Sequence, residues 1–582
     1  MAAPRVLARS PLTAVVAASA LVLAGCGGDD PSPEQRFADA LASGDVAAAA
    51  ELTTDPAAAS AAIGALFDGV DAQQHDFTVA RGGDSFTLSA DWDLGDGKRW
   101  QYSTEGTVVS ADGAGRVSWD PAILAPGLDA DSTVRYTPTA PRPAQVRAAD
   151  GQPLLTRQVV TLVNLQPTAD PAAVAPLLAP VVPTISADSL RSDLAKSDGT
   201  PVTAVTLRDS DVAPVRSALA AIPGVDLVDQ TRLLTVDKAL SSPVFADLAT
   251  VWQQGEDASA GWAVQLVRPG GATARLAGQD GTPAPDIDTT LDLRLQTAAE
   301  GALGSLPQPA AIVALRPSTG AVLAVAQNAP ADAQGAVALT GLYPPGSTFK
   351  TVTTSAALQA GTVTPDTVLP CPGTENVEGR QIPNDDNFDL GQVPLHTAFA
   401  RSCNTTMARL AVSLPADALQ QAALQFGLGL DYVTPGLTTV TGSVPSADSP
   451  AQRVESAIGQ GEVTASPFGM ALVAASIAHG STPAPMMIAG RPATSDRAVD
   501  AVPATVDADL RAMMRETVTG GTARILADLP NLEGKTGTAE YGVGTGSHGW
   551  FVGIDGDLAF AVFVAGADSS GPALDAAGRF LR

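Results

Sequence analysis

Three short motifs hold the residues of this chain that are best suited to covalent chemistry. They are Ser347-Thr-Phe-Lys350, Ser402-Cys-Asn404 and Lys535-Thr-Gly, in that order along the chain. The sequence contains only five lysines, and two of them complete these motifs. A serine becomes a nucleophile when a neighbouring base takes its proton, and a neutral lysine can be that base. The motifs therefore predict nucleophilic catalysis by Ser347.

The sequence around Ser347 predicts that this residue lies at or near the N-terminus of a helix. Tyr343-Pro-Pro-Gly precedes it and an apolar helical run follows. Helix N-termini favour negative charge, which would help an attacking alkoxide. Lys350 lies three residues later, over the same helix face. Its pKa must fall for it to act as a base, through burial or through a nearby cation, for which Lys535 is the candidate.

The third motif predicts a strand that receives an extended substrate. Lys535-Thr-Gly-Thr538 lies in a strand-like context within an antiparallel hairpin. Gly537 permits close approach of a substrate backbone, which can pair with the strand. Lys535 and the hydroxyls of Thr536 and Thr538 are then expected to contact a terminal carboxylate of the substrate.

These three motifs, in this order, resemble the active-site set of enzymes that acylate a serine with β-lactams or with D-alanyl-D-alanine peptides. On them the chain resembles a class B penicillin-binding protein. The resemblance implies that Ser402 relays a proton between the leaving nitrogen and the lysines. It also implies that Asn404 holds a substrate amide and helps to position Lys350. The backbone N–H groups of Ser347 and Thr538 would form the oxyanion hole.

The activity that this resemblance implies is cross-linking of peptidoglycan stem peptides by a D,D-transpeptidase without a cofactor. Ser347 would attack the penultimate D-alanine carbonyl, and an amine of a neighbouring stem peptide would resolve the acyl-enzyme. β-Lactams would acylate the same serine, and a separate glycan polymerase is a possible partner. A D,D-carboxypeptidase and a non-catalytic β-lactam receptor remain alternatives. A β-lactamase is disfavoured, because the chain lacks a Glu-x-x-Leu-Asn motif and carries two accessory domains.

The composition limits the partners of the chain. A formal net charge of -27 over 582 residues argues against a nucleic-acid partner, which requires clustered basic residues. The histidines His75, His396, His479 and His548 are scattered and show no spacing suited to a metal site. We therefore expect neither nucleic acid nor metal to bind.

The N-terminus predicts export and a lipid anchor. Arg5 and Arg9 precede an apolar stretch, and Leu23-Ala-Gly-Cys26 follows. This tetrad resembles a bacterial lipobox, so residues 1–25 would be a lipoprotein signal peptide and Cys26 the lipidated residue. The alternative is an uncleaved signal anchor. In either case we expect the protein on the outer face of the bacterial cytoplasmic membrane, with residues 26–33 as a tether.

Two further cysteines, Cys371 and Cys403, are candidates for a disulfide. Thiols of an exported protein can be oxidised. Their distance cannot be deduced from the sequence, so a disulfide and two separate buried thiols remain equally open.

The chain length predicts a multidomain α+β protein, because one hydrophobic core rarely organises so many residues. Residues 34–140 resemble the small α+β domain, similar to nuclear transport factor 2, of methicillin-resistance-type penicillin-binding proteins. Residues 141–287 resemble the β-rich pedestal, or dimerisation domain, although Ala148-Ala-Asp-Gly stands where many members have Asp-Arg-x-Gly. Residues 288–582 resemble the transpeptidase domain, in which an antiparallel sheet is flanked by helices.

Overall fold

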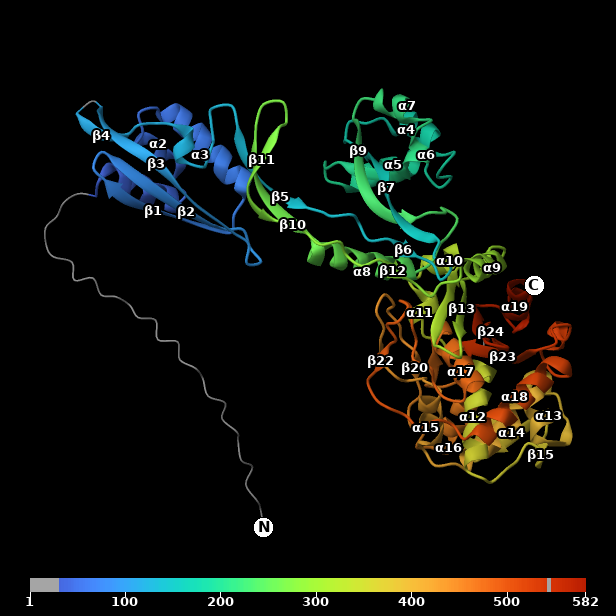
Figure 1. Cartoon of the computed structure of the whole chain (residues 1–582). Coiled ribbons are helices and arrows are strands. Elements are labelled where there is room, and N and C mark those ends of the chain that lie inside the picture. The colour runs from blue at the N-terminus through green and yellow to red at the C-terminus, as the bar shows by residue number, and fades with distance from the viewer. Residues whose placement is uncertain (1–30, 112, 542–545) are drawn as a thin grey trace, which may run out of the picture. The chain divides into compact units, whose positions relative to one another are not determined.

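The structure is a computed structural model that describes residues 31–111, 113–541 and 546–582 (Figure 1). It divides into two units, of which the first spans Met1–Pro141 and Ala260–Thr282 and the second spans Arg142–Ser259 and Pro283–Arg582. The predicted signal peptide and Cys26 lie outside the described residues. None of the described helices combines the length and the apolar composition that crossing a membrane requires.

The first unit consists of helices followed by antiparallel strands. Its elements are α1 (Pro33–Ala42), α2 (Val46–Glu51), α3 (Pro56–Val70), β1 (Gln74–Gly82), β2 (Ser85–Asp93), β3 (Arg99–Ala111), β4 (Ala114–Val117), η1 (Pro121–Ile123), β5 (Thr133–Thr139), β10 (Gly261–Val267) and β11 (Thr273–Gln279). Strands β1 to β4 form a meander, and β5, β10 and β11 form a second sheet in the order β11-β10-β5. The helices and both sheets bury one core, to which Phe37, Trp92 and Leu266 belong.

The boundary between the first two predicted domains differs from the observed division. The sequence predicted residues 141–287 as one domain, whereas the structure places Ala260–Thr282 in the first unit. The reason is strand pairing, because β10 is antiparallel to β5 along its whole length. Two strands distant in sequence thus share one sheet.

The second unit begins with a mixed sheet and the helices that cover it. The elements are β6 (Val146–Arg147), β7 (Pro153–Leu165), α4 (Pro171–Leu178), α5 (Ala187–Lys196), β8 (Val202–Arg208), α6 (Asp209–Val212), α7 (Arg216–Ala220), β9 (Val225–Thr235), α8 (Val244–Ser259) and β12 (Ile287–Asp288). The sheet order is β12-β6-β7-β8, and β9 also pairs with β7. Helices α4 to α7 and the strands bury a small core of their own, whereas Trp252 of α8 joins the core of the C-terminal residues.

The remaining residues of the second unit form helices around a five-stranded sheet. The helices are α9 (Leu293–Leu303), α10 (Ala329–Asp332), α11 (Val337–Thr340), η2 (Gly346–Phe349), α12 (Lys350–Gln359), η3 (Asp385–Asn387), α13 (Leu395–Ala400), α14 (Asn404–Val412), α15 (Ala418–Gln425), α16 (Pro450–Ala457), α17 (Pro467–His479), α18 (Ala504–Thr519), η4 (Arg524–Leu526) and α19 (Gly571–Leu581). The strands are β13 (Ala310–Arg316), β14 (Ala321–Gln327), β15 (Val368–Cys371), β16 (Thr374–Val377), β17 (Arg380–Pro383), β18 (Gly391–Pro394), β19 (Tyr432–Val433), β20 (Gly442–Ser443), β21 (Thr464–Ala465), β22 (Thr494–Ser495), β23 (Leu532–Tyr541), β24 (Gly546–Asp555) and β25 (Leu558–Val564).

The five-stranded sheet is antiparallel throughout and has the order β14-β13-β25-β24-β23. Both of its faces are buried, which explains why β13 is apolar without alternation. Ala311 and Val313 face the core that contains α17, whereas Ile312 and Ala314 face the core that contains α9 and α19. This confirms the predicted antiparallel sheet flanked by helices and leaves β23 at its edge.

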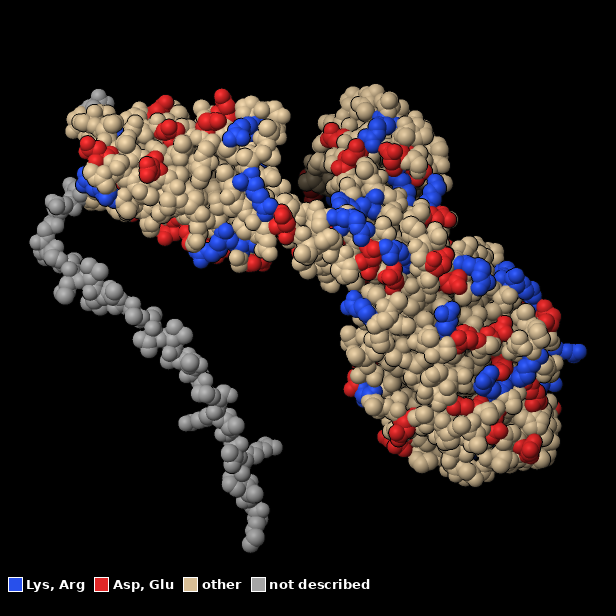
Figure 2. All heavy atoms as spheres, viewed as in Figure 1, with Lys and Arg blue, Asp and Glu red and all other residues tan. Residues whose placement is uncertain are grey.

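The surface carries charges of both signs. On the face drawn in Figure 2, acidic and basic side chains are interspersed over each unit. The excess of acidic residues is thus a property of the whole composition.

Candidate active site

The predicted nucleophile lies directly before a buried helix. Ser347 is half-buried in the 3-10 turn η2, and α12 begins at Lys350. All residues of α12 from Lys350 to Leu358 are buried, so the helix runs through the core. The expected helix N-terminus at Ser347 is therefore realised as a 3-10 turn that leads into the α-helix.

The backbone before Ser347 packs tightly against the edge strand β23. Gly346 has a φ of +54°, and a Cβ added there would lie 2.4 Å from the Thr538 carbonyl oxygen. A Cβ added to Gly537 would lie 2.9 Å from the Pro345 carbonyl oxygen. Two glycines thus allow the backbones around Ser347 and Thr538 to approach each other.

Ser402 and Asn404 lie where α13 ends and α14 begins. Ser402 has a φ of +61°, which is uncommon for a residue other than glycine. This conformation turns the chain between the two helices within three residues, from Ala400 at the end of α13 to Asn404 at the start of α14. Ser402 therefore lies in a turn between two helices.

Lys350 donates hydrogen bonds to this turn. Its Nζ atom lies 2.7 Å from Ser402 O, 3.1 Å from Ser402 Oγ and 2.6 Å from Asn404 Oδ1. Three oxygen atoms of this turn thus surround the Lys350 amine.

Lys535 reaches the same hydroxyl from β23. Its Nζ atom lies 3.0 Å from Ser402 Oγ and 3.0 Å from Thr536 O, and 5.7 Å from the centre of the Phe399 ring. The Thr536 hydroxyl is itself hydrogen-bonded to the hydroxyl of Thr522, at 2.6 Å. Strand β23 therefore brings the second lysine into contact with the turn between α13 and α14.

The two lysines have lowered pKa values. Both side chains are fully buried. Burial lowers the pKa of Lys350 well below its usual range, and the charge of Lys535 lowers it further, whereas Asp385 acts in the opposite direction. Burial also lowers the pKa of Lys535 to about 7. Both lowered pKa values favour the neutral amine, the form that can accept a proton.

Four of the five predicted catalytic residues form one hydrogen-bonded group, namely Lys350, Ser402, Asn404 and Lys535. Among the described residues, no hydrogen bond of this group reaches Ser347 Oγ. Ser347 precedes Lys350 by one helical turn along the chain. The arrangement can move a proton between Lys350 and Lys535 through Ser402 Oγ.

The substrate-binding residues expected from the third motif lie on β23, the edge strand of the five-stranded sheet. Strand β23 pairs only with β24 in the sheet of the described residues. Thr536 and Gly537 are buried, whereas Thr538 is half-buried. An extended peptide can therefore add to the sheet along β23.

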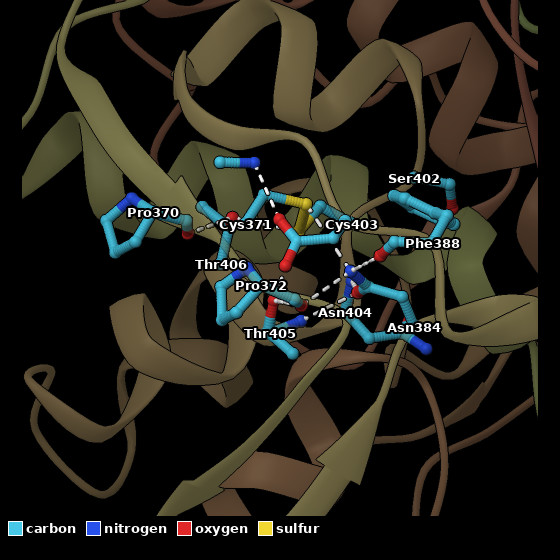
Figure 3. Close-up of a disulfide and its surroundings, with 12 residues drawn as sticks. Pro370, Cys371, Pro372, Asn384, Phe388, Ser402, Cys403, Asn404, Thr405 and Thr406 are labelled. Carbon is cyan, nitrogen blue, oxygen red and sulfur yellow. Dashed lines mark hydrogen bonds between the residues drawn. A yellow bond between two sulfur atoms is a disulfide. The ribbon is translucent and has the colours of Figure 1, made fainter.

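Cys371 and Cys403 form a disulfide, with their Cα atoms 6.1 Å apart (Figure 3). It ties the end of β15 to the residue between Ser402 and Asn404. Of the two possibilities that the sequence left open, the structure contains the bonded one.

Asn384 is a site residue that the sequence motifs do not reveal. It is 2% exposed and contacts the backbone of Asn404. The only sequence signal is the polar run Asn384-Asp-Asp-Asn387, which indicates a turn. A turn does not predict a buried contact to a residue twenty positions later.

Comparison with known proteins places this site in a family. Residues 310–580 match the model of the penicillin binding protein transpeptidase domain. The chain is 32% identical over 362 residues to the peptidoglycan D,D-transpeptidase PbpA of Mycolicibacterium smegmatis, covering 51% of this chain and 70% of that protein. It is 31% identical over 319 residues to PbpA of Mycobacterium tuberculosis, and 28% identical over 310 residues to the peptidoglycan D,D-transpeptidase MrdA of Acinetobacter baumannii.

The fold, the three motifs and the domain match place the chain in the penicillin-binding class of proteins. The chain belongs to the class B penicillin-binding proteins. The match to the Mycobacterium tuberculosis relative covers 46% of this chain and 64% of that protein, so the chain spans less than two thirds of its length.

Proposed function

We propose that the chain is a peptidoglycan D,D-transpeptidase that works through an acyl-enzyme on Ser347. The observation that carries this proposal is the convergence of two buried lysines on one hydroxyl. Lys350 Nζ and Lys535 Nζ lie 3.1 and 3.0 Å from Ser402 Oγ, beside the turn that holds Ser347. Two amines that share one hydroxyl can carry a proton from an attacking nucleophile to a leaving amine.

In the proposed acylation step, Ser347 Oγ attacks the carbonyl carbon of the penultimate D-alanine of a stem peptide. Neutral Lys350 takes the hydroxyl proton. The N–H groups of Ser347 and Thr538 stabilise the oxyanion. Lys350 returns this proton through Ser402 Oγ to the nitrogen of the terminal D-alanine, and the C–N bond to that nitrogen breaks.

In the proposed second step, an amine of a neighbouring stem peptide attacks the acyl-enzyme carbonyl. The ester bond to Ser347 breaks, the serine regains a proton, and a new amide bond cross-links two peptides. The place of β23 at the edge of the sheet supports the donor assignment in the first step. An extended donor peptide can pair there while Lys535, Thr536 and Thr538 contact the carboxylate of its terminal D-alanine. A β-lactam would acylate Ser347 in the same way.

The test of the site is covalent labelling. A fluorescent penicillin should label the protein, peptide mapping should find the label on Ser347, and the Ser347→Ala variant should remain unlabelled. A Ser347→Ala protein that labels like the wild type would refute the assignment.

The test of the reaction is product analysis. The purified protein is given a D-alanyl-D-alanine pentapeptide with and without an amine acceptor. The proposal expects the cross-linked amide in the presence of acceptor. Release of D-alanine with a hydrolysed donor only would indicate a D,D-carboxypeptidase, and penicillin labelling without turnover of any peptide would indicate a receptor.

We also propose roles for the other parts of the chain. The helices and the four-stranded meander of the first unit support a domain similar to nuclear transport factor 2, and the sheet around β7 supports a pedestal.

Cys26, in a lipobox-like sequence, would anchor the protein to the outer face of the membrane. Incorporation of a labelled fatty acid that persists in Cys26→Ala would exclude the anchor. Co-purification of a membrane-bound glycan polymerase would identify that proposed partner.

A further inference from the structure

Asn384 is a fully enclosed amide beside the candidate active site. It lies between the end of β17 and η3, and only 2% of the residue is exposed. Figure 3 shows it between Pro372, Phe388 and the start of α14, next to the disulfide. A buried amide in a loop requires partners for both its oxygen and its nitrogen.

Both ends of this amide are hydrogen-bonded to backbone groups. Its Oδ1 atom accepts from the N–H groups of Asn404, at 2.8 Å, and Thr405, at 3.2 Å. Its Nδ2 atom donates to the carbonyl oxygens of Pro372, at 2.9 Å, and Phe388, at 2.8 Å. The amide therefore ties two segments of a loop to the first turn of a helix.

This contact caps α14 from outside the helix. The first N–H groups of a helix have no partner within it, and a side chain at the N-cap position usually accepts from them. The N-cap residue of α14 is Cys403, which makes no side-chain capping bond, since its sulfur is in the disulfide. Asn384 supplies the missing acceptor from a residue distant in sequence.

The neighbouring carbonyl group fixes the Asn404 side chain. Asn404 Nδ2 donates to Pro383 O at 2.8 Å, and this bond leaves Asn404 Oδ1 directed at Lys350 Nζ, 2.6 Å away. The Pro383–Asn384 segment thus determines both where α14 begins and which atom of Asn404 faces Lys350.

We propose that Asn384 is a positioning residue for the acylation step, which holds the Ser402 and Asn404 contacts of Lys350 in register. The proposal rests on the proposed function of the site. Asn384 acts on the chemistry through Asn404, since it caps the helix that starts there.

The experiment compares second-order rate constants of acylation by a fluorescent penicillin, as a function of pH, in the full chain. Asn384→Ala removes these four bonds and a fifth, from Nδ2 to Cys371 Sγ at 3.4 Å. It is expected to slow acylation by about 10- to 100-fold, the loss that goes with an unsatisfied buried polar group. Asn376→Ala is the matched control, because Asn376 is an exposed residue of the nearby strand β16. Among the described residues, its side chain accepts a hydrogen bond only from Gly379 N. It is expected to stay within about twofold of the wild type.

A second variant separates positioning from stability. Asn384→Asp keeps an oxygen for the N–H groups of α14 but cannot donate to Pro372 and Phe388, and it adds a negative charge. The charged groups that influence Lys350 are Lys535 and Asp385. A further carboxylate raises the pKa of Lys350, so the acid limb of the rate profile is expected to move to higher pH.

The outcomes are distinct. Slow acylation in folded, disulfide-bonded Asn384→Ala, or the pH shift in Asn384→Asp, supports the proposal. If Asn384→Ala melts at a lower temperature but each folded molecule is acylated at the wild-type rate, the proposal is overturned. If Asn384→Ala does not fold, an Asn384→Asp variant whose pH profile of acylation is unshifted overturns it. If the wild type labels at Ser347 and only these predictions fail, the proposed function stands. A wild type that never labels overturns both.

Discussion

Lys350 and Lys535 donate hydrogen bonds to the same atom, Ser402 Oγ, at 3.1 and 3.0 Å. Burial penalises the charged form of both lysines, and the charge of Lys535 adds to this effect at Lys350. Lowered pKa values of both lysines follow from this arrangement. The site is therefore built to hold at least one neutral amine, at a cost in stability.

The first prediction concerns that cost. The pKa of Lys535 is about 7 in the folded chain against 10.5 for an unperturbed lysine, so between these pH values the unfolded chain binds more protons than the folded one. This lysine makes the free energy of unfolding rise as pH increases from about 7 to 10.5, with its full penalty present below pH 7. Lys535→Met is expected to stabilise the fold at pH 7 by on the order of 2 kcal/mol and to flatten this pH dependence.

The measurement is denaturant unfolding at a series of pH values. Lys238→Met is the control, because Lys238 is largely exposed and, within the described part of the chain, forms an ion pair only with Asp211. A Lys535→Met protein that is less stable than the wild type at every pH would contradict the prediction. The same variant is expected to lose penicillin acylation, since the relay loses one of its two amines.

The second prediction separates the hydroxyl of Ser402 from its backbone. Ser402→Ala and Ser402→Gly both remove the oxygen that the two lysines share, so each is expected to slow acylation by about 10²- to 10⁴-fold. Only glycine relieves the φ of +61°. Ser402→Gly should therefore be about 1 kcal/mol more stable than Ser402→Ala.

Acylation kinetics and unfolding, measured on both variants, check this prediction. Equal stability of the two variants would show that the left-handed conformation costs nothing here. If Ser402→Gly is acylated much faster than Ser402→Ala, the backbone conformation of Ser402 and not its hydroxyl limits the reaction.

The local structure around the motifs could be predicted from the sequence because it depends on neighbouring residues. The prolines and glycine before Ser347 predict an abrupt start of a helix, and η2 and α12 begin there. The hairpin context of Lys535 corresponds to β23 and β24. The sequence therefore predicts which type of element carries each motif.

The contacts between distant segments could not be predicted in this way. Nothing near Asn384 indicates that its amide caps α14, because the partner is chosen by packing of the loop against the helix. Likewise, Thr133–Thr139 pairs with Gly261–Val267 across a whole intervening sheet. Propensity determines whether a segment is a strand, whereas the hydrophobic core that it joins determines its partner.

The third prediction concerns the disulfide between Cys371 and Cys403. It closes a loop with a sequence separation of 32. Replacing both cysteines by alanine is expected to lower the free energy of unfolding by about 3 to 4 kcal/mol, as loop closure in the unfolded chain predicts. Acylation should also slow, because Cys403 lies between Ser402 and Asn404.

Guanidinium unfolding with and without reductant tests this expectation. Reductant present during refolding should bring the wild type to the stability of the double variant and leave the double variant unchanged. Equal stability of the oxidised wild type and the double variant would show that the bond contributes nothing to the fold.

The fourth prediction tests the close approach between Gly346 and β23. A Cβ at this position would lie 2.4 Å from Thr538 O, so Gly346→Ala must separate η2 from the strand that carries the Lys-Thr-Gly motif.

Gly361→Ala is a matched control, because Gly361 has a comparable φ of +69° and open space around its Cβ position. The control isolates the backbone cost of about 1 to 2 kcal/mol, and its acylation rate should equal that of the wild type. Gly346→Ala is expected to lose more stability than the control and at least tenfold in acylation rate, measured with fluorescent penicillin on the folded protein. If both variants acylate equally fast, the distance between Ser347 and Thr538 does not limit the reaction, and the oxyanion hole must be formed by other donors.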